Sequence, residues 1–557
     1  MRRGRVANFK RVLLMGVLLV AAVGAYVALD DEDAPRHAPT LEQMADEIGA
    51  EVMTHLYRGH VAGRSGEIML VPKPHNYLTG EWDLRKLGTD TPETFVSHPN
   101  PWSYLARVPL VFYGPGYAPE ALEVSIDADL TDVAPTYARL LDLEKFEADG
   151  RALDEILTKK SSPRVILTVV IDGGGWNVLN RYRESWRTIA RLASAGTMYT
   201  NATIGSAPSL TGPVHSNLGT GRYPITHGVP TNPWLGLAHP GTLRVPTLSE
   251  LWDESTGNKA IVAMMGYEDP HLGMIGHGAQ RDGGDRDIAV FWDVDKFAWR
   301  TGEQFYELPD YLVPPDLDAL ETYERGLDLE DGAVDDAWRG HGIHLAREAT
   351  PAFATFTGDA VVQIMRNEPL GKDAITDLLW VEMKMPDAAG HVWNMVSPEE
   401  EEVLREVDRQ IARFKSELDG SVGKGNYLIV ISADHGQEPF AEVTGGWRIN
   451  FRELARDLES EFGSVVEKVT LLDLQIDRSR IGSEGPTLLD VARYIGTYTL
   501  EENIPDGAPG ADRVSPDRLN ERLFAGAFPT DFLQELTPQK LKSFGDSAYP
   551  EGALSRR

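Results

Sequence analysis

The chain has 557 residues, of which 42% are hydrophobic and 25% charged, so it is long enough for one large globular domain or two ordinary ones. Its formal net charge of −31 disfavours binding of nucleic-acid backbones or anionic lipid by the body of the protein, because such phosphates are recruited by Lys and Arg. The absence of cysteine excludes disulfides, thiolate metal ligands and thiol nucleophiles.

The first residues carry a targeting pattern. The basic stretch MRRGRVANFKR is followed by an uncharged apolar run at residues 12–29 and then by the acidic DDED. This order predicts a signal anchor or signal peptide within residues 1–33, with its basic end kept inside. The run of 18 residues is just long enough to span a bilayer, which favours an uncleaved anchor. We therefore expect an extracytoplasmic protein that is anchored to the cell membrane by this segment or secreted.

Apolar, β-branched runs alternate with helical patterns along the rest of the chain. Three runs predict buried strands: RVILTVVID (164–172), DLLWVEMKM (377–385) and NYLIVISAD (426–434). Between the last two lies a predicted helix at 397–418. Ser397 and Glu400 form a capping-box pattern there, and the residues with helical spacing are Leu404, Val407, Ile411, Phe414 and Leu418. This alternation predicts an α/β fold with a mostly parallel central sheet flanked by helices.

Acidic residues follow each predicted strand. Any one of them alone could be a helix cap or a turn former. Together they form a pattern: Asp387 stands four residues before His391, Asp434 is next to His435, and Asp172 precedes three glycines. Ligands of open α/β sheets gather at the carboxyl ends of strands. Carboxylate and imidazole are the donors expected for zinc or a similar divalent ion.

Residues 207–234 read APSLTGPVHSNLGTGRYPITHGVPTNPW. Thr211 stands there in a T-x-P-x-H context, ahead of a T-G-x-Y-P…H-G segment at 220–228. With the three strand ends, this ordered set of motifs resembles the alkaline phosphatase superfamily, closest to its nucleotide pyrophosphatase/phosphodiesterase branch. The resemblance implies an alkaline-phosphatase-like fold and a hydrolase of phosphate esters that uses two divalent ions, expected to be Zn²⁺.

The resemblance also implies roles for individual residues. Thr211 would be the nucleophile that forms a phosphothreonine intermediate, and Asn232 would contact a non-bridging phosphoryl oxygen, unless it is simply a turn former. The ligands implied for one ion are Asp172, Thr211, Asp434 and His435. The ligands implied for the other ion are Asp387 and His391, together with a third histidine that normally follows the Asp-His pair. No histidine follows His435 in this chain.

The missing ligand has a candidate near the start of the chain. Residues 65–154 contain SHPNPW, VPLVFYGPGY and LTDVAPTYARLL, which resemble the C-terminal segment of the same superfamily. His98 stands in the ligand's place, although Pro99 and Asn100 depart from the usual Gly-Ser. We therefore predict a circular permutation, the alternative being that His98 is a surface-loop histidine. The predicted organisation is a single catalytic domain at 34–557, made of a permuted segment (34–160), a metal-site core (161–235 and 376–445), a cap (236–375) and peripheral helices and strands (446–557).

The substrate class is less constrained. Tyr267-Glu268-Asp269 stands where monoesterases of one branch carry a Lys-x-Arg clamp, and acidic residues are ill suited to hold a dianion. This favours a phosphodiester or phosphonate over a monoester, with a small-molecule or lipid-like leaving group chosen by the cap. The alternatives are a phosphate monoesterase, an envelope phosphotransferase or an inactive surface-binding protein. We expect no nucleic-acid duplex as a partner. His215 and His227 are interpreted as structural, and His271 has no partner spacing beyond chance.

Overall fold

The computed structural model describes residues 38–79, 96–157, 162–232, 242–330, 332, 334–482, 485–508 and 510–549. The predicted signal segment at 1–33 lies outside these residues. Within the part of the chain that is described, no helix is both long and apolar enough to cross a membrane. The residues from Thr40 onward belong to one compact unit, Thr40–Arg557.

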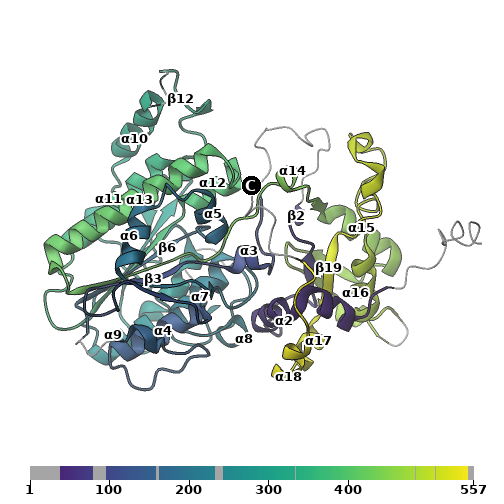
Figure 1. The fold of residues 1–557 in the computed structure, drawn as a ribbon, viewed down its shortest axis with the longest axis horizontal. Helices are drawn as coiled ribbons and strands as arrows, with labels where there is room; N and C mark the ends of the chain where they lie inside the picture. Colours follow the sequence, from purple (N-terminus) through teal and green to yellow (C-terminus); the bar gives the residue numbers. More distant parts are fainter. Residues whose placement is uncertain are drawn as a thin grey trace, which may run out of the picture. The chain divides into compact units, whose positions relative to one another are not determined.

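Nine strands among the described residues form the main sheet of this unit (Figure 1). From edge to edge they are β11 (Ala298–Arg300), β10 (Ile288–Asp293), β9 (Val262–Met265), β14 (Asp377–Met383), β6 (Val165–Ile171), β15 (Tyr427–Ser432), β3 (Leu110–Tyr113), β7 (Thr197–Tyr199) and β4 (Leu122–Val124). The neighbours β10, β9, β14, β6 and β15 run parallel, whereas β11–β10, β15–β3 and β3–β7 are antiparallel pairs. The predicted α/β fold with a mostly parallel sheet is confirmed.

The three strands predicted from apolar runs are β6, β14 and β15, and β6 lies between the other two. Every residue of all three is buried. Side chains alternate between the faces of a strand, so β6 contributes Leu167 and Val169 to one core and Ile166 and Val170 to another. A strand covered on both faces needs apolar residues at every position, which explains the unbroken runs.

Helices contribute to the cores on both faces of the sheet (Figure 1). On the face of Leu167 these are α6 (Arg187–Ala195), α10 (Leu317–Glu330), α11 (Pro351–Asn367), α12 (Met385–Trp393) and α13 (Pro398–Leu418). On the face of Ile166 they are α4 (Val133–Leu140), α7 (Thr211–Thr220) and α9 (Leu248–Thr256).

The helix predicted at 397–418 is α13, and its predicted apolar face is fully buried. The predicted capping box is only half right. Ser397 Oγ accepts the Glu400 backbone N–H at 3.1 Å, but the Glu400 carboxylate accepts a hydrogen bond from Gln437 Nε2 at 3.0 Å. The carboxylate is therefore used to fix the loop after β15, in which Asp434 and His435 lie.

The prediction of a cap over 236–375 is wrong for much of this interval. α9, β9, β10 and β11 belong to it, and they form part of the main sheet and its helical cover. Its aromatic residues pack into the core of the molecule: the rings of Trp299 and Phe356 stack with centroids 5.1 Å apart, and Trp292 lies edge-on to Trp299. They are ordinary core residues.

A second, smaller sheet within the described residues joins early and late parts of the chain. Its order is β17 (Val466–Val469), β18 (Asp473–Ile476), β1 (Ile68–Pro72) and β19 (Phe524–Pro529). It shares hydrophobic clusters with α2 (Leu41–Gly59), α15 (Phe451–Phe462) and α16 (Leu488–Thr497). β1 pairs antiparallel with both β18 and β19. The residues predicted as peripheral therefore build a core of their own with the early segment.

Candidate metal centre

The predicted ligands gather at the carboxyl ends of the parallel strands. Asp172 directly follows β6, Asp387 and His391 lie in α12 just after β14, and the Asp434-His435 pair follows β15. Because parallel strands end at the same edge of a sheet, side chains far apart in sequence meet there. The local sequence places them: β6, β14 and β15 are held in register by their apolar cores, and each turns out of the sheet at its acidic residue.

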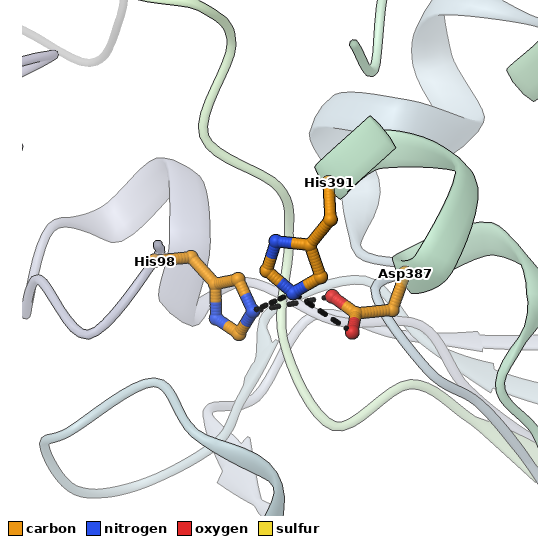
Figure 2. Close-up of side chains that lie close together, drawn as sticks. All are labelled: His98, Asp387 and His391. Carbon is orange, nitrogen blue, oxygen red and sulfur yellow. Dashed lines mark hydrogen bonds and ion pairs between the residues drawn. The ribbon is translucent and has the colours of Figure 1, made fainter. Parts of the chain in front are cut away.

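His98, Asp387 and His391 form the first of two ligand groups (Figure 2). His98 Nε2 lies 3.1 Å from Asp387 Oδ1 and 3.3 Å from His391 Nε2, and His391 Nε2 lies 3.1 Å from Asp387 Oδ2. Each imidazole uses its other nitrogen on a backbone carbonyl: His98 Nδ1 donates to Ser209 O at 2.7 Å, and His391 Nδ1 donates to Val96 O. With Nδ1 protonated, both Nε2 atoms keep a lone pair directed into the group, as a metal ligand requires.

Asp172, Asp434 and His435 form the second group. His435 Nε2 lies 3.4 Å from Asp172 Oδ1 and 3.3 Å from Asp434 Oδ2. These three atoms have no hydrogen-bond partner among the described residues, and none of the side chains is more than 1% exposed. Buried polar atoms are normally hydrogen bonded, so three unpartnered donor atoms in one place are the pattern of a cation site.

The electrostatics of the centre favour a bound cation. Burial raises the pKa of Asp434 well above its usual range, and the negative charges of Asp172 and Asp387 raise it further. Burial lowers the pKa of His435 to about 3, so its imidazole stays neutral and can bind a metal. Burial acts to raise the pKa of Asp172 too, but the Lys384 ammonium together with His271 and His435 holds that pKa below its usual range. Divalent ions relieve this crowding of carboxylates.

The ligand atoms of both groups are suited to binding divalent ions. The first offers two imidazole nitrogens and a carboxylate, and the second offers one imidazole and two carboxylates. Nitrogen and oxygen donors of this kind suit Zn²⁺ and related ions. The structure thus brings His98 together with Asp387 and His391, although the chain places it almost 300 residues earlier.

A pocket of about 670 Å³ opens over the first group, and Thr211 and Asn232 line it together with His98, Asp387 and His391. Thr211 begins α7 and is 2% exposed. Asn232 accepts the Gly212 backbone N–H on its Oδ1 at 2.8 Å. Both predicted catalytic residues therefore face the same cavity as the first ligand group.

The two histidines interpreted as structural are fully buried and hold other groups in place. His215 Nδ1 donates to Thr211 O at 2.7 Å and lies 3.8 Å from Asp434 Oδ2, so it connects the backbone of Thr211 to the second ligand group. His227 Nε2 bonds to Asn217 Oδ1 at 3.0 Å, within the helix that starts at Thr211.

Three charged side chains beside the centre escape sequence reasoning. Lys384 Nζ lies 3.1 Å from Asp172 Oδ2 and 2.6 Å from Asp387 Oδ2. His271 Nε2 lies 3.4 Å from Glu382 Oε2 and 3.7 Å from Asp172 Oδ2, although His271 has no telling neighbour in sequence. Glu382 and Lys384, in contrast, could have been noticed in the sequence. Glu382 lies within the apolar strand β14 and Lys384 directly follows it, and a buried charge there is tolerated only if it is paired.

Tyr267, Glu268 and Asp269, which stand where the sequence comparison with monoesterases expects a clamp, make different contacts. Glu268 and Tyr267 line the pocket. Asp269 is instead paired with Arg300 Nη1 at 3.0 Å, on strand β11. One acidic side chain of the pair, Glu268, therefore lines the same pocket as Thr211.

An α/β sheet with imidazole and carboxylate groups at its carboxyl edge, beside a buried threonine, agrees with the predicted resemblance to the alkaline phosphatase superfamily. Residues 166–475, more than half of the chain, match the family model described as type I phosphodiesterase / nucleotide pyrophosphatase. The chain belongs to this family.

The individual relatives share only low sequence identity with this chain. A protein named calcium-transporting ATPase from Myroides odoratus is 25% identical over 442 residues, which cover 66% of this chain and 80% of that protein. Alkaline phosphatase PafA from Elizabethkingia meningoseptica is 23% identical over 414 residues, covering 61% of this chain and 74% of PafA. The crystal structure of wild-type PafA aligns with a TM-score of 0.49 at 20% identity, covering 66% of this chain and 84% of PafA.

Proposed function

We propose that this protein hydrolyses phosphate esters at a centre of two divalent ions, with Thr211 as the nucleophile. The observation that supports this most directly is that Thr211 lines one pocket with the group of His98, Asp387 and His391. The second ligand group is connected to the Thr211 backbone through His215. From the nitrogen and oxygen donors of both groups we propose Zn²⁺ as the ion.

In the proposed reaction, Thr211 Oγ1 forms a bond to phosphorus while the bond from phosphorus to the leaving oxygen breaks. Water then attacks phosphorus and the bond from phosphorus to Thr211 Oγ1 breaks, which restores the threonine and releases a phosphate monoester from a diester, or inorganic phosphate from a monoester. Two ions, if held by the two ligand groups, would supply Lewis-acid stabilisation of the attacking and leaving oxygens. Thr211 stands at the N-terminus of α7, where the helix dipole favours the negative charge of the phosphoryl group.

We assign Asn232 to a non-bridging phosphoryl oxygen. Its carbonyl oxygen is held by the Gly212 N–H, which fixes the amide plane beside Thr211. The NH2 group is then the end that can donate into the pocket that Asn232 lines. A fixed donor aimed at developing charge stabilises the transition state, as in an oxyanion hole.

The preferred substrate in this proposal is a phosphodiester or phosphonate. Glu268 lines the pocket near Thr211, and its charge opposes the second negative charge of a monoester. A phosphate monoester is the second candidate, because a curated relative is named as an alkaline phosphatase and because Lys384 brings a cation to the pocket wall.

Two further proposals concern the organisation of the chain. We propose that residues 65–154 are a permuted C-terminal segment. In support, β3 pairs with β15 within the main sheet, and His98 contacts Asp387. From the apolar run at 12–29 we propose an extracytoplasmic location.

The test is a substrate panel with the purified full-length protein: aryl phosphodiester, phosphomonoester and phosphonate esters, with chelator and with Zn²⁺ restored. We expect the diester or phosphonate to be turned over fastest, chelator to abolish turnover and Zn²⁺ to restore it. Thr211→Ala should lower kcat by about 10³-fold or more, as nucleophile removal does in other hydrolases, while the ion of the group of His98, Asp387 and His391 stays bound. Unreduced turnover by Thr211→Ala would exclude the proposed nucleophile.

A further inference from the structure

Lys384 is the cation that links the two ligand groups. It lies at the start of α12, three residues before Asp387, and is 9% exposed. Its ammonium contacts one carboxylate of each group, Asp172 Oδ2 at 3.1 Å and Asp387 Oδ2 at 2.6 Å. Both contacts are charge-assisted hydrogen bonds, which are the strong ones in protein interiors.

These contacts use particular oxygens. Asp172 Oδ1 and Asp387 Oδ1 have no hydrogen-bond partner within the described residues. They are the oxygens turned toward His435 and His98, at 3.4 and 3.1 Å respectively. Lys384 therefore contacts the Oδ2 of each carboxylate and leaves each Oδ1 for its ligand group, while Asp387 Oδ2 also lies 3.1 Å from His391 Nε2. It fixes the rotation of both carboxylates without blocking either group.

A third set of potential ligands lies on the same side of Asp172. The donor atoms of Asp172, His271 and Glu382 lie within 4.8 Å of one another, and all three side chains are buried. His271 Nε2 is 3.7 Å from Asp172 Oδ2, the oxygen that Lys384 contacts. Both oxygens of Glu382 lack a hydrogen-bond partner among the described residues. By its chemistry alone this set could attract a further divalent ion.

The Lys384 ammonium opposes such an ion, since like charges near one oxygen repel. The ammonium is in direct contact with the carboxylates of Asp172 and Asp387, so its positive charge lies beside Asp172, which also belongs to the third set. A lysine is suited to this role because its ammonium is a compact point charge on a flexible stem.

We propose that Lys384 stands in for a third divalent ion: it orients Asp172 and Asp387 for the two-ion centre and excludes a cation from the set of Asp172, His271 and Glu382. Lys384 is a positioning residue in this scheme. The inference rests on the proposed two-ion function, and it predicts how many ions each variant of the chain holds.

The experiment counts metal ions. The full-length protein is stripped with chelator, dialysed against Zn²⁺ and Mg²⁺ together, and its bound ions are measured by elemental analysis. We expect two ions per chain in the wild type and three in Lys384→Met. Lys384→Arg should keep two, because it keeps the charge. Lys384→Met combined with Glu382→Gln should return to two, because the third set loses a ligand. Lys415→Met is the matched control, since Lys415 pairs with Asp419 at 2.8 Å outside the centre.

Activity provides a second readout. We expect turnover by Lys384→Met to rise at least threefold on addition of Mg²⁺, whereas the wild type and Lys384→Arg do not respond. If Lys384→Met does not fold, Lys384→Gln removes the same charge and keeps a hydrogen-bond donor. Two ions in the wild type and in both neutral variants, or three ions already in the wild type, would overturn the inference. If the wild type holds fewer than two ions and Thr211→Ala does not reduce turnover, these results would instead count against the proposed function.

Discussion

The substitution His98→Ala tests the most distant connection in the candidate metal centre. His98 supplies one of three ligand atoms in the first group, and its ring is fixed by the bond from Nδ1 to Ser209 O at 2.7 Å. Loss of an outer-shell partner of a ligand already weakens metal binding by about 10- to 100-fold. Loss of the ligand itself should therefore cost at least about 100-fold, or about 2.7 kcal/mol of binding free energy.

The same substitution affects the metal-free protein. The Ser209 carbonyl is buried and loses its donor, which costs about 1–3 kcal/mol in the free energy of unfolding. We therefore expect His98→Ala to show a lower Tm without metal and a smaller gain in Tm when Zn²⁺ is added. Calorimetric titration of the stripped protein with Zn²⁺ measures the affinity, and elemental analysis measures the stoichiometry.

His277→Ala is the matched control for this experiment. Its ring likewise bonds a carboxylate, Glu250, at 2.9 Å and a backbone carbonyl, Leu243 O, at 3.2 Å, and it belongs to neither ligand group. We expect it to lose stability but to keep its Zn²⁺ affinity. If His98→Ala binds two ions as tightly as this control does, His98 is not a ligand and the permutation loses its main support.

Three other predictions follow from individual contacts. Asn232→Ala should lower kcat/KM by about 10²- to 10³-fold with unchanged metal content, because it removes one donor to the phosphoryl group; an unchanged rate would refute that role. Gly173→Ala should weaken Zn²⁺ binding, because a Cβ at this position would lie 3.0 Å from Asp387 Cα. Gly257 is the control: it has the same φ of +70°, but a Cβ there would meet nothing within 4 Å, so Gly257→Ala should lower only the stability of the fold. Burial and then the charge of Asp285 raise the pKa of Asp253 from 3.8 to about 7. The folded state therefore binds the carboxyl proton of Asp253 more tightly than the unfolded state does, and the stability of the fold decreases as the pH rises from about 3.8 to about 7. Asp253→Asn should therefore raise the Tm more at about pH 8 than at about pH 5, and equal shifts in thermal melts would contradict this.

The parts of the fold that could be predicted are those in which one physical requirement dominates the local sequence. β6, β14 and β15 are covered on both faces, so their sequences are apolar at every position. Their ends could be recognised because Asp172 and Asp434 stop apolar runs abruptly. The buried face of α13 followed from its spacing alone.

The errors have equally physical causes. β9 has four residues and follows a helix end, so its apolar run is too short to distinguish from a loop or helix segment. The cap predicted over 236–375 includes this strand and the aromatic residues after it, whose rings pack in the core of the molecule. Lys384 and His271 act through tertiary contacts with Asp172, and no spacing along the chain encodes those contacts. Sequence reasoning found the candidate ligands that follow the strands and missed the charges beside them.

The pairing of β3 with β15 sets an order of events during synthesis. Leu110 pairs with Ser432, so β3 leaves the ribosome long before its partner on that side exists. The same holds for β1, whose partners β18 and β19 lie in the last part of the chain. Contacts between residues so far apart in sequence are slow to form, since the closing of long loops must come first. The early segment therefore waits with exposed strand edges, and we expect folding in the cell to depend on factors that bind unpaired apolar strands until the last residues arrive.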